Sequence, residues 1–201
     1  MRKTYQKTTP GVKNGKVQKK QNHRKTLNYW NTRQQEIQID IEKPGAGYKH
    51  FLKKRDIQKF LSILPHFEEI EKELDCILLA GGGNGADGWY DDGILAICAW
   101  EKEMTVKLGG WYYEDHKAIF DRLNVVQEPK GQHFTCYFTE HQIKAYQLLH
   151  IFLHELGHHH DRISTKNGWP NAPRGEGYAE SYAFKYEKII WNRFFEVFPM
   201  V

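Results

Sequence analysis

The sequence has few cysteines, no long apolar run and no acidic residue in its first 35 positions. Three cysteines among 201 residues, an odd number without CxxC spacing, predict reduced core thiols in a cytoplasmic protein. No stretch approaches the roughly 20 apolar residues of a membrane-spanning helix. The basic N-terminus is not followed by the apolar segment of a secretory signal. The sequence therefore predicts neither membrane contact nor export.

The net charge of +4 conceals an uneven distribution along the chain. Residues 1–35 contain ten Lys or Arg and no Asp or Glu, whereas residues 36–201 contain the other 19 basic residues and all 25 acidic ones. The first segment has too few apolar residues to offset its conformational entropy by burial. We therefore expect a disordered basic arm over 1–35, docked at Tyr29 and Trp30 on a folded domain over 36–201. The arm is either solvated or contacts nucleic acid or another polyanion.

The pattern of residues 36–201 predicts strands first and long helices last, which favours the α+β class. Alternating or continuous apolar residues predict strands over 36–42, 76–80, 93–100, 105–108 and 133–138, with 105–108 continuing the sheet of 93–100. Apolar residues at helical spacing predict helices over 49–64, 67–74, 116–123, 140–160 and 177–197.

Residues 81–88 are rich in glycine and include the GxGxxG spacing of dinucleotide sites. Such a site needs a following helix whose N-terminus faces the pyrophosphate, but the next apolar segment predicts a strand. The nearby aspartates lack the spacing of an EF-hand calcium loop. A flexible connection between two strands is the better interpretation.

The segment His154-Glu155-Leu156-Gly157-His158 indicates a metal site. Residues four apart lie on one face of a helix, so the imidazoles of His154 and His158 can bind one ion. Glu155 lies beside them, placed to take a proton from a metal-bound water, as in the HExxH motif of zinc peptidases. Gly157 is costly inside a helix, so we expect another element to pack closely against it.

Three other histidines on the same helix have different expected roles. His150 lies one turn before the motif, on the apolar stripe, and is expected in the core. His159 and His160 are rotated away from the metal-binding face and are expected to be exposed or to support the ligands.

A catalytic zinc also needs a third protein ligand and an open position. Asp161 and Ser164 replace the Gly and His of the metzincin pattern, and no histidine follows His160. Glu176 lies 18 residues beyond His158 at the start of the last predicted helix, and Glu180 follows one turn later on the same face. The spacing allows either glutamate to face the metal.

This combination resembles the gluzincin group of zinc metallopeptidases, in which HExxH is followed on a second helix by Glu-x-x-x-Asp. The chain reads Glu176-Gly-Tyr-Ala-Glu180, with Glu at the usual Asp. It is also similar to the compact ImmA/IrrE-type members, whose E-x-x-A-x-x-F/Y-A pattern it matches through Ala183. The resemblance covers about residues 140–186. It implies a zincin-like fold, in which a small twisted sheet packs on the motif helix and an edge strand, 93–100 or 133–138, lines the cleft.

The resemblance implies a zinc-dependent peptidase that acts on a protein or peptide substrate. Zn²⁺ would be held by His154, His158 and Glu176, and Glu155 would be the general base. Glu180 would accept the free ring N–H of a ligating histidine.

Two questions stay open from the sequence. Tyr178, Tyr182 and Arg174 are the candidates for stabilising the oxyanion, and their spacing does not rank them. The alternatives to a peptidase are a zincin fold used for binding or regulation and a nucleic-acid-associated protein that works through its basic arm.

Overall fold

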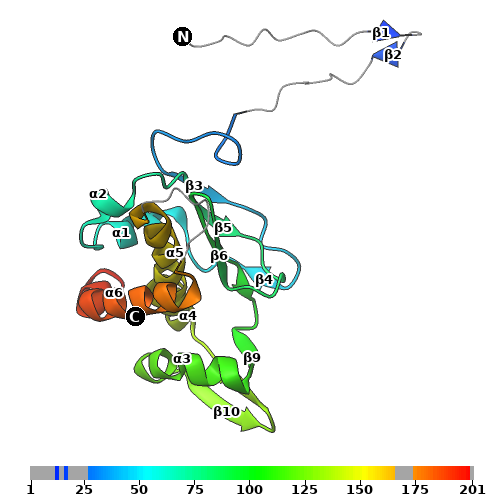
Figure 1. The fold of residues 1–201 in the computed structure, drawn as a ribbon. Helices are drawn as coiled ribbons and strands as arrows, with labels where there is room; N and C mark the ends of the chain where they lie inside the picture. Colours follow the sequence, from blue (N-terminus) through cyan, green and yellow to red (C-terminus); the bar gives the residue numbers. More distant parts are fainter. Residues whose placement is uncertain (1–11, 14–15, 18–26, 166–173, 200–201) are drawn as a thin grey trace.

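The computed structural model describes residues 12–13, 16–17, 27–165 and 174–199. It has a four-stranded sheet, a three-stranded sheet and several helices, which confirms the predicted α+β class. Figure 1 shows the motif helix passing between the larger sheet and the C-terminal helix, with the smaller sheet at one end of the molecule. Within the described residues, no helix is both long and apolar enough to cross a bilayer.

The larger sheet has the strand order β3-β5-β7-β6. Strands β3 (Gln38–Ile41), β5 (Cys76–Ala80) and β7 (Ile94–Cys98) are parallel, and β5 and β7 are buried along their whole length, as their continuous apolar sequences require. The edge strand β6 (Gly88–Asp91) runs antiparallel to β7. The prediction of a flexible connection is therefore wrong for these four residues.

The smaller sheet is antiparallel, in the order β10-β11-β9. Its strands are β9 (Thr105–Gly109), β10 (Val126–Lys130) and β11 (His133–Tyr137), and α3 (Gly110–Arg122) packs against it. Strand β9 does not continue the sheet of β7, contrary to expectation, and β10 was not predicted because four of its five residues are polar or proline. Helix α3 also begins earlier than predicted.

Short elements complete the domain. Strand β4 (Tyr48–Lys49) pairs with β8 (Trp100–Glu101), so α1 (Lys54–Leu61) is shorter than the predicted helix over 49–64. Helix α2 (Phe67–Ile70) is a single turn and is also shorter than the predicted helix over 67–74. In the arm, β1 (Val12–Lys13) pairs with β2 (Lys16–Val17).

The predicted helix over 140–160 extends to residue 164 and has three parts. It begins at α4 (Glu140–Tyr146) with the capping box of Thr139 and Gln142, widens to a π-helix, η1 (Gln147–Phe152), and continues as α5 (Leu153–Ser164). The wider π turns lie directly before the motif, and such turns are frequent at functional sites. The C-terminal helix is α6 (Glu176–Val197).

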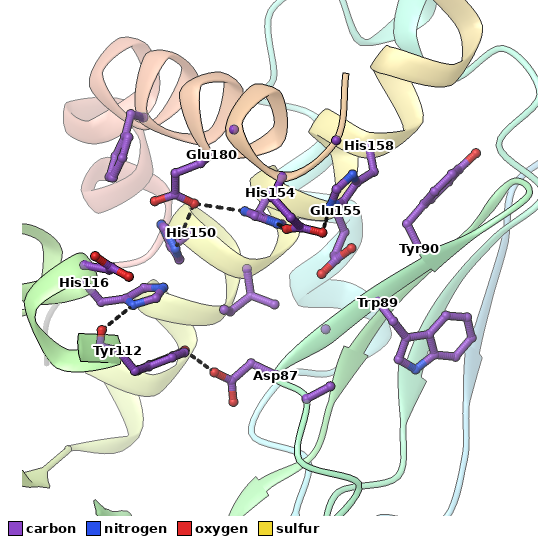
Figure 2. A pocket seen from close by; sticks show the side chains of 18 of the residues that line it. Asp87, Trp89, Tyr90, Tyr112, His116, His150, His154, Glu155, His158 and Glu180 are labelled. Atoms are coloured by element: carbon purple, nitrogen blue, oxygen red, sulfur yellow. Dashed lines mark hydrogen bonds and ion pairs between the residues drawn. The ribbon is translucent and has the colours of Figure 1, made fainter. Parts of the chain in front are cut away.

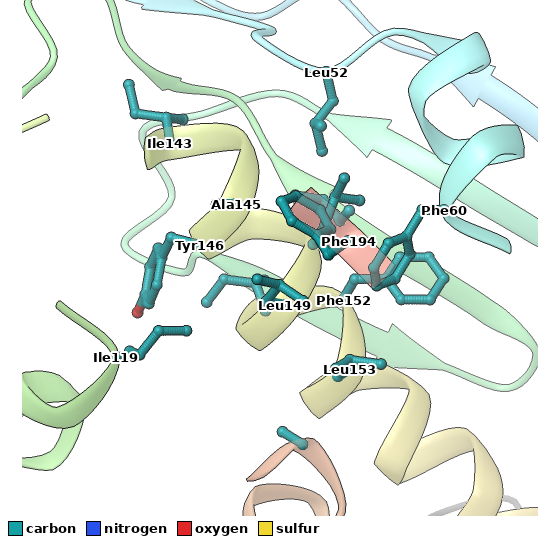
Figure 3. Packing of buried hydrophobic residues seen from close by; sticks show 14 of the residues in the cluster. Leu52, Phe60, Ile119, Ile143, Ala145, Tyr146, Leu149, Phe152, Leu153 and Phe194 are labelled. Atoms are coloured by element: carbon teal, nitrogen blue, oxygen red, sulfur yellow. The ribbon is translucent and has the colours of Figure 1, made fainter. Parts of the chain in front are cut away.

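The main core lies between α1, the motif helix and α6 (Figure 3). The ring of Phe60 meets those of Phe152 and Phe194 edge to face, at centroid distances of 5.2 and 6.1 Å. Gly157 allows the close approach that was expected, because a Cβ atom there would lie 2.8 Å from the Cα of Ala179. The contact holds the start of α6 against the motif.

The end of the basic arm contacts the folded domain, as predicted. Tyr29 donates a hydrogen bond to Asp40 at 2.8 Å, and Trp30 stacks on Trp89 with ring centroids 6.0 Å apart. Arg33 forms an ion pair with buried Asp75 at 2.6 Å. Residues 27–35 of the predicted arm thus contact the folded domain, and the prediction of disorder concerns mainly 1–11, 14–15 and 18–26, which lie outside the described residues.

Candidate metal centre

Helices α5 and α6 bring together the three residues predicted to hold a metal. One ligand atom each from His154, His158 and Glu176 lies within 4.8 Å of the others. The Glu176 carboxylate lies 3.0 Å from Nε2 of His154 and 3.5 Å from Nε2 of His158. Donors about 3.4 Å apart surround a tetrahedral ion at ~2.0–2.1 Å. Two imidazoles and one carboxylate at these distances could hold a metal ion.

Glu180 lies behind His154, as predicted. Its carboxylate accepts a hydrogen bond from Nδ1 of His154 at 3.0 Å (Figure 2). Nε2 of the same ring lies 3.0 Å from the Glu176 carboxylate. Burial alone would raise the pKa of Glu180, but the hydrogen bond with His154 and the charges of nearby histidines lower it. Glu180 therefore stays ionised and holds His154 in the tautomer that a metal ligand needs.

Glu155 is buried on the side of α5 that faces the edge strand β6. Burial raises the pKa of its carboxyl to about 7; His154 opposes this shift, and Glu176 and Asp87 add to it. Gly88 of β6 leaves the space that the carboxylate occupies, because a Cβ atom there would lie 2.9 Å from Oε1 of Glu155. The local backbone thus accommodates a carboxylate that titrates near neutral pH.

A cavity of about 1020 Å³ opens beside the three ligand residues. Its walls are the β6 strand and the loop before it, α3, the motif helix and the start of α6. The lining strand is β6, so the prediction that 93–100 or 133–138 lines the cleft is wrong. A local signal for β6 was present: Asp92 and Gly93 form a two-residue turn with positive φ angles of 34° and 92°, the Asp-Gly pattern of a tight hairpin.

The three residues considered for oxyanion stabilisation do not line this cavity. Arg174 binds Asp161 and stacks on Tyr178, whose hydroxyl hydrogen-bonds His160 at 2.7 Å. Tyr182 is buried between the helices.

Two residues with no recognisable signal in the sequence line the cavity wall opposite the motif helix. Tyr112 of α3 donates a hydrogen bond to Asp87, and His116 donates through Nδ1 to the Tyr112 carbonyl at 2.7 Å (Figure 2). Burial raises the pKa of Asp87. Tyr112 and Asp87 are 25 residues apart in the sequence, so no local pattern could have predicted their contact.

The other histidines of the motif helix lie outside the ligand set. His150 is buried, as predicted, and burial lowers its pKa to about 3. His159 is buried rather than exposed: it hydrogen-bonds the Ile70 carbonyl at 2.9 Å and Tyr90 at 3.0 Å, and burial lowers its pKa to about 4. Within the described residues, the metal cluster contains only His154, His158 and Glu176.

Asp161, one turn after the motif, fixes the start of α6. Its fully buried carboxylate accepts hydrogen bonds from the backbone N–H groups of Arg174, at 2.7 Å, and Gly175, at 3.3 Å. Gly175 precedes the helix with φ +69°, a conformation that favours glycine. Glu176 is the next residue, so Asp161 determines where this ligand lies relative to the two histidines.

Comparison with known proteins gives no match: no protein-family model, curated protein or solved structure is significantly similar to the chain. The function is therefore argued from the residues and geometry of the site.

Proposed function

We propose that this protein is a zinc-dependent peptidase with a zincin-like fold. The observation that carries the proposal is the convergence of His154, His158 and Glu176 beside a buried Glu155, at the wall of a large cavity. Two nitrogens and one oxygen with an open side are the donor set of catalytic zinc in peptidases, whereas structural zinc sites are closed by four protein ligands.

Each side chain has a role that follows from its position. A zinc ion held by His154, His158 and Glu176 would supply a bound water of lowered pKa and would polarise a substrate carbonyl. Glu155 lies beside these residues and would hold or release a proton at its carboxylate, since burial raises the pKa of this carboxyl to about 7. Glu180 keeps Nε2 of His154 directed at the ion position.

The cavity also suits an extended peptide. Strand β6 pairs with β7 along one edge and borders the cavity, and it is the last strand of its sheet. An edge strand offers unpaired backbone groups to an added strand, the recognition mode known as β-augmentation. A peptide bound in this way would lie alongside Glu155 and the two histidines.

The direct test measures metal content and hydrolysis on the same preparation. We expect one zinc per chain, cleavage of casein, loss of cleavage after chelation and recovery on adding zinc. A chain that binds zinc stoichiometrically and leaves casein intact would favour the alternative of a zincin fold used for binding or regulation.

A further inference from the structure

Helix α3 presents an aromatic and an acidic side chain to the cavity that the proposed chemistry does not use. Trp111 and Asp115 lie four residues apart, so they are neighbours on one face of the helix, and both line the cavity. Trp111 is 76% exposed, the highest value among the large hydrophobic side chains of the described residues. Within these residues, the ion pairs of α3 join Lys117 to Asp121 and Arg122 to Glu187, which leaves Asp115 unpaired.

Among the Asp, Glu, Lys and Arg residues that line the cavity, all are acidic. No Lys or Arg contributes to its described walls, whereas these carboxylates do: Asp87, Asp91, Asp92, Asp115, Glu155, Glu176 and Glu180. Arg33 neutralises Asp92 at 2.6 Å, and a divalent ion at the metal centre would offset two further charges. The remaining carboxylates lie on several walls of one concavity, where low-dielectric surroundings strengthen their field.

A buried polar atom without a partner lies in the wall that the motif helix forms. His150 is 1% exposed, lines the cavity, and its Nδ1 has no hydrogen-bond partner in the described part of the chain. Its Nε2 lies 3.8 Å from the Glu180 carboxylate. A buried polar atom such as Nδ1 is stabilised by a ligand that forms a hydrogen bond with it.

We propose that the α3 side of the cavity is a subsite for a basic substrate residue, Lys or Arg, close to the scissile bond. The proposal rests on the proposed peptidase function and names its substrate class. The face of Trp111 attracts the cation, Asp115 pairs with it, and the carboxylates of the facing walls disfavour an acidic residue. Substrates would therefore be polypeptides with basic segments.

The test separates binding from cleavage. Zinc-loaded Glu155→Gln protein is titrated calorimetrically with three peptides that are identical except for Lys, Gln or Glu at one position, and the position is moved along the peptide. We expect the Lys peptide to bind about tenfold more tightly than the Gln peptide at one position, and the Glu peptide to bind more weakly still. The wild-type protein should show the same order in kcat/KM.

A matched pair of variants locates the preference. Asp115→Asn should remove most of the tenfold difference between the Lys and Gln peptides. Glu114→Gln makes the same change of charge at an exposed neighbour that does not line the cavity, so it should keep the preference.

Every outcome decides between the two proposals. Equal binding of the Lys and Gln peptides at all positions, or equal losses in the two variants, would overturn the subsite. Preferential binding of Lys by a protein that cuts none of the peptides would keep the subsite and overturn the peptidase. Cleavage of the peptides without a charge preference would keep the peptidase and overturn the subsite.

Discussion

The carboxylate of Glu180 accepts a hydrogen bond from Nδ1 of His154 at 3.0 Å. Glu180 lies on α6, the helix that also carries Glu176. One helix thus supplies both the third candidate ligand and the group that orients a histidine ligand. This arrangement separates the roles of two glutamates that lie only one turn apart.

The first prediction follows from that separation. Glu176→Ala should abolish stoichiometric zinc, whereas Glu180→Ala should weaken zinc affinity by roughly 10–100-fold, the usual cost of losing a group that supports a ligand. Glu180→Gln keeps an acceptor oxygen and should lose less than Glu180→Ala. Competition against a chromogenic chelator measures all three, and the reverse order would exchange the roles of the two glutamates.

A second prediction concerns the contact between α5 and α6. Gly157→Ala should destabilise the fold by about 1–3 kcal/mol, because its Cβ would lie 2.8 Å from the Cα of Ala179. It should also lower zinc affinity, since the two ligand helices must separate. Gly177→Ala is the control, because a Cβ there meets no atom within 4 Å. Urea unfolding and zinc titration of both variants provide the comparison, and equal effects would contradict this account of the contact.

The third prediction concerns Asp161, which positions Glu176 through the backbone of Arg174 and Gly175. Asp161→Asn should lower zinc affinity and cost about 1–3 kcal/mol of folding free energy. A cobalt-loaded sample should show altered d–d absorption, which a loss of stability alone would not produce. Unchanged affinity and spectrum would mean that Glu176 is held by other contacts.

The pH dependence of that variant gives a fourth prediction. Burial would raise the pKa of Asp161, but the hydrogen bonds and charge of Arg174 lower it overall. A lowered folded-state pKa stabilises the fold above the unfolded value of about 3.9, and this stabilisation disappears as the pH falls through the folded-state value. The stability difference between wild type and Asp161→Asn should therefore be full at pH 6 and shrink below about pH 4. A difference that is constant over this range would contradict the shift.

The end of the basic arm supports a fifth prediction. Removing residues 1–26 should leave zinc binding and thermal stability unchanged, and trypsin should trim this part of the full chain first. Arg33→Ala should destabilise the fold by about 1–2 kcal/mol, because it leaves the buried Asp75 carboxylate without its cation, although Arg33 is half-exposed. Thermal unfolding compares the two changes, and equal stability of Arg33→Ala and wild type would show that the contact adds nothing.

The sequence predicted that His154 and His158 lie side by side because their geometry is local. His154 and His158 lie within one helix, where spacing alone fixes their relation, and the Pro- and Gly-containing sequence before Glu176 indicated a helix start. The close approach at Gly157 was also predicted from the cost of glycine inside a helix. Strand β6 was missed because it is short and half-buried, although its Asp-Gly turn was a local signal. The contribution of α3 to the cavity depends on contacts between distant segments.

The cavity wall formed by α3 could not be predicted from the sequence either. In the sequence, Tyr112 lies before the predicted helix over 116–123 and His116 begins it, and only the folded chain brings Asp87 within hydrogen-bonding reach of Tyr112. Arg174 and Tyr178 were candidates for stabilising the oxyanion, but they pack on Asp161 and His160 and do not line the cavity.

The central claim is that Glu155 moves the proton for a reaction at the metal centre. The most direct test is zinc content and peptide hydrolysis of Glu155→Gln, measured on the same sample beside wild type. We predict one zinc per chain, an unchanged fold and a loss of at least ~10²-fold in turnover, the usual size of a lost acid–base group. Undiminished turnover by the zinc-loaded variant would contradict the mechanism.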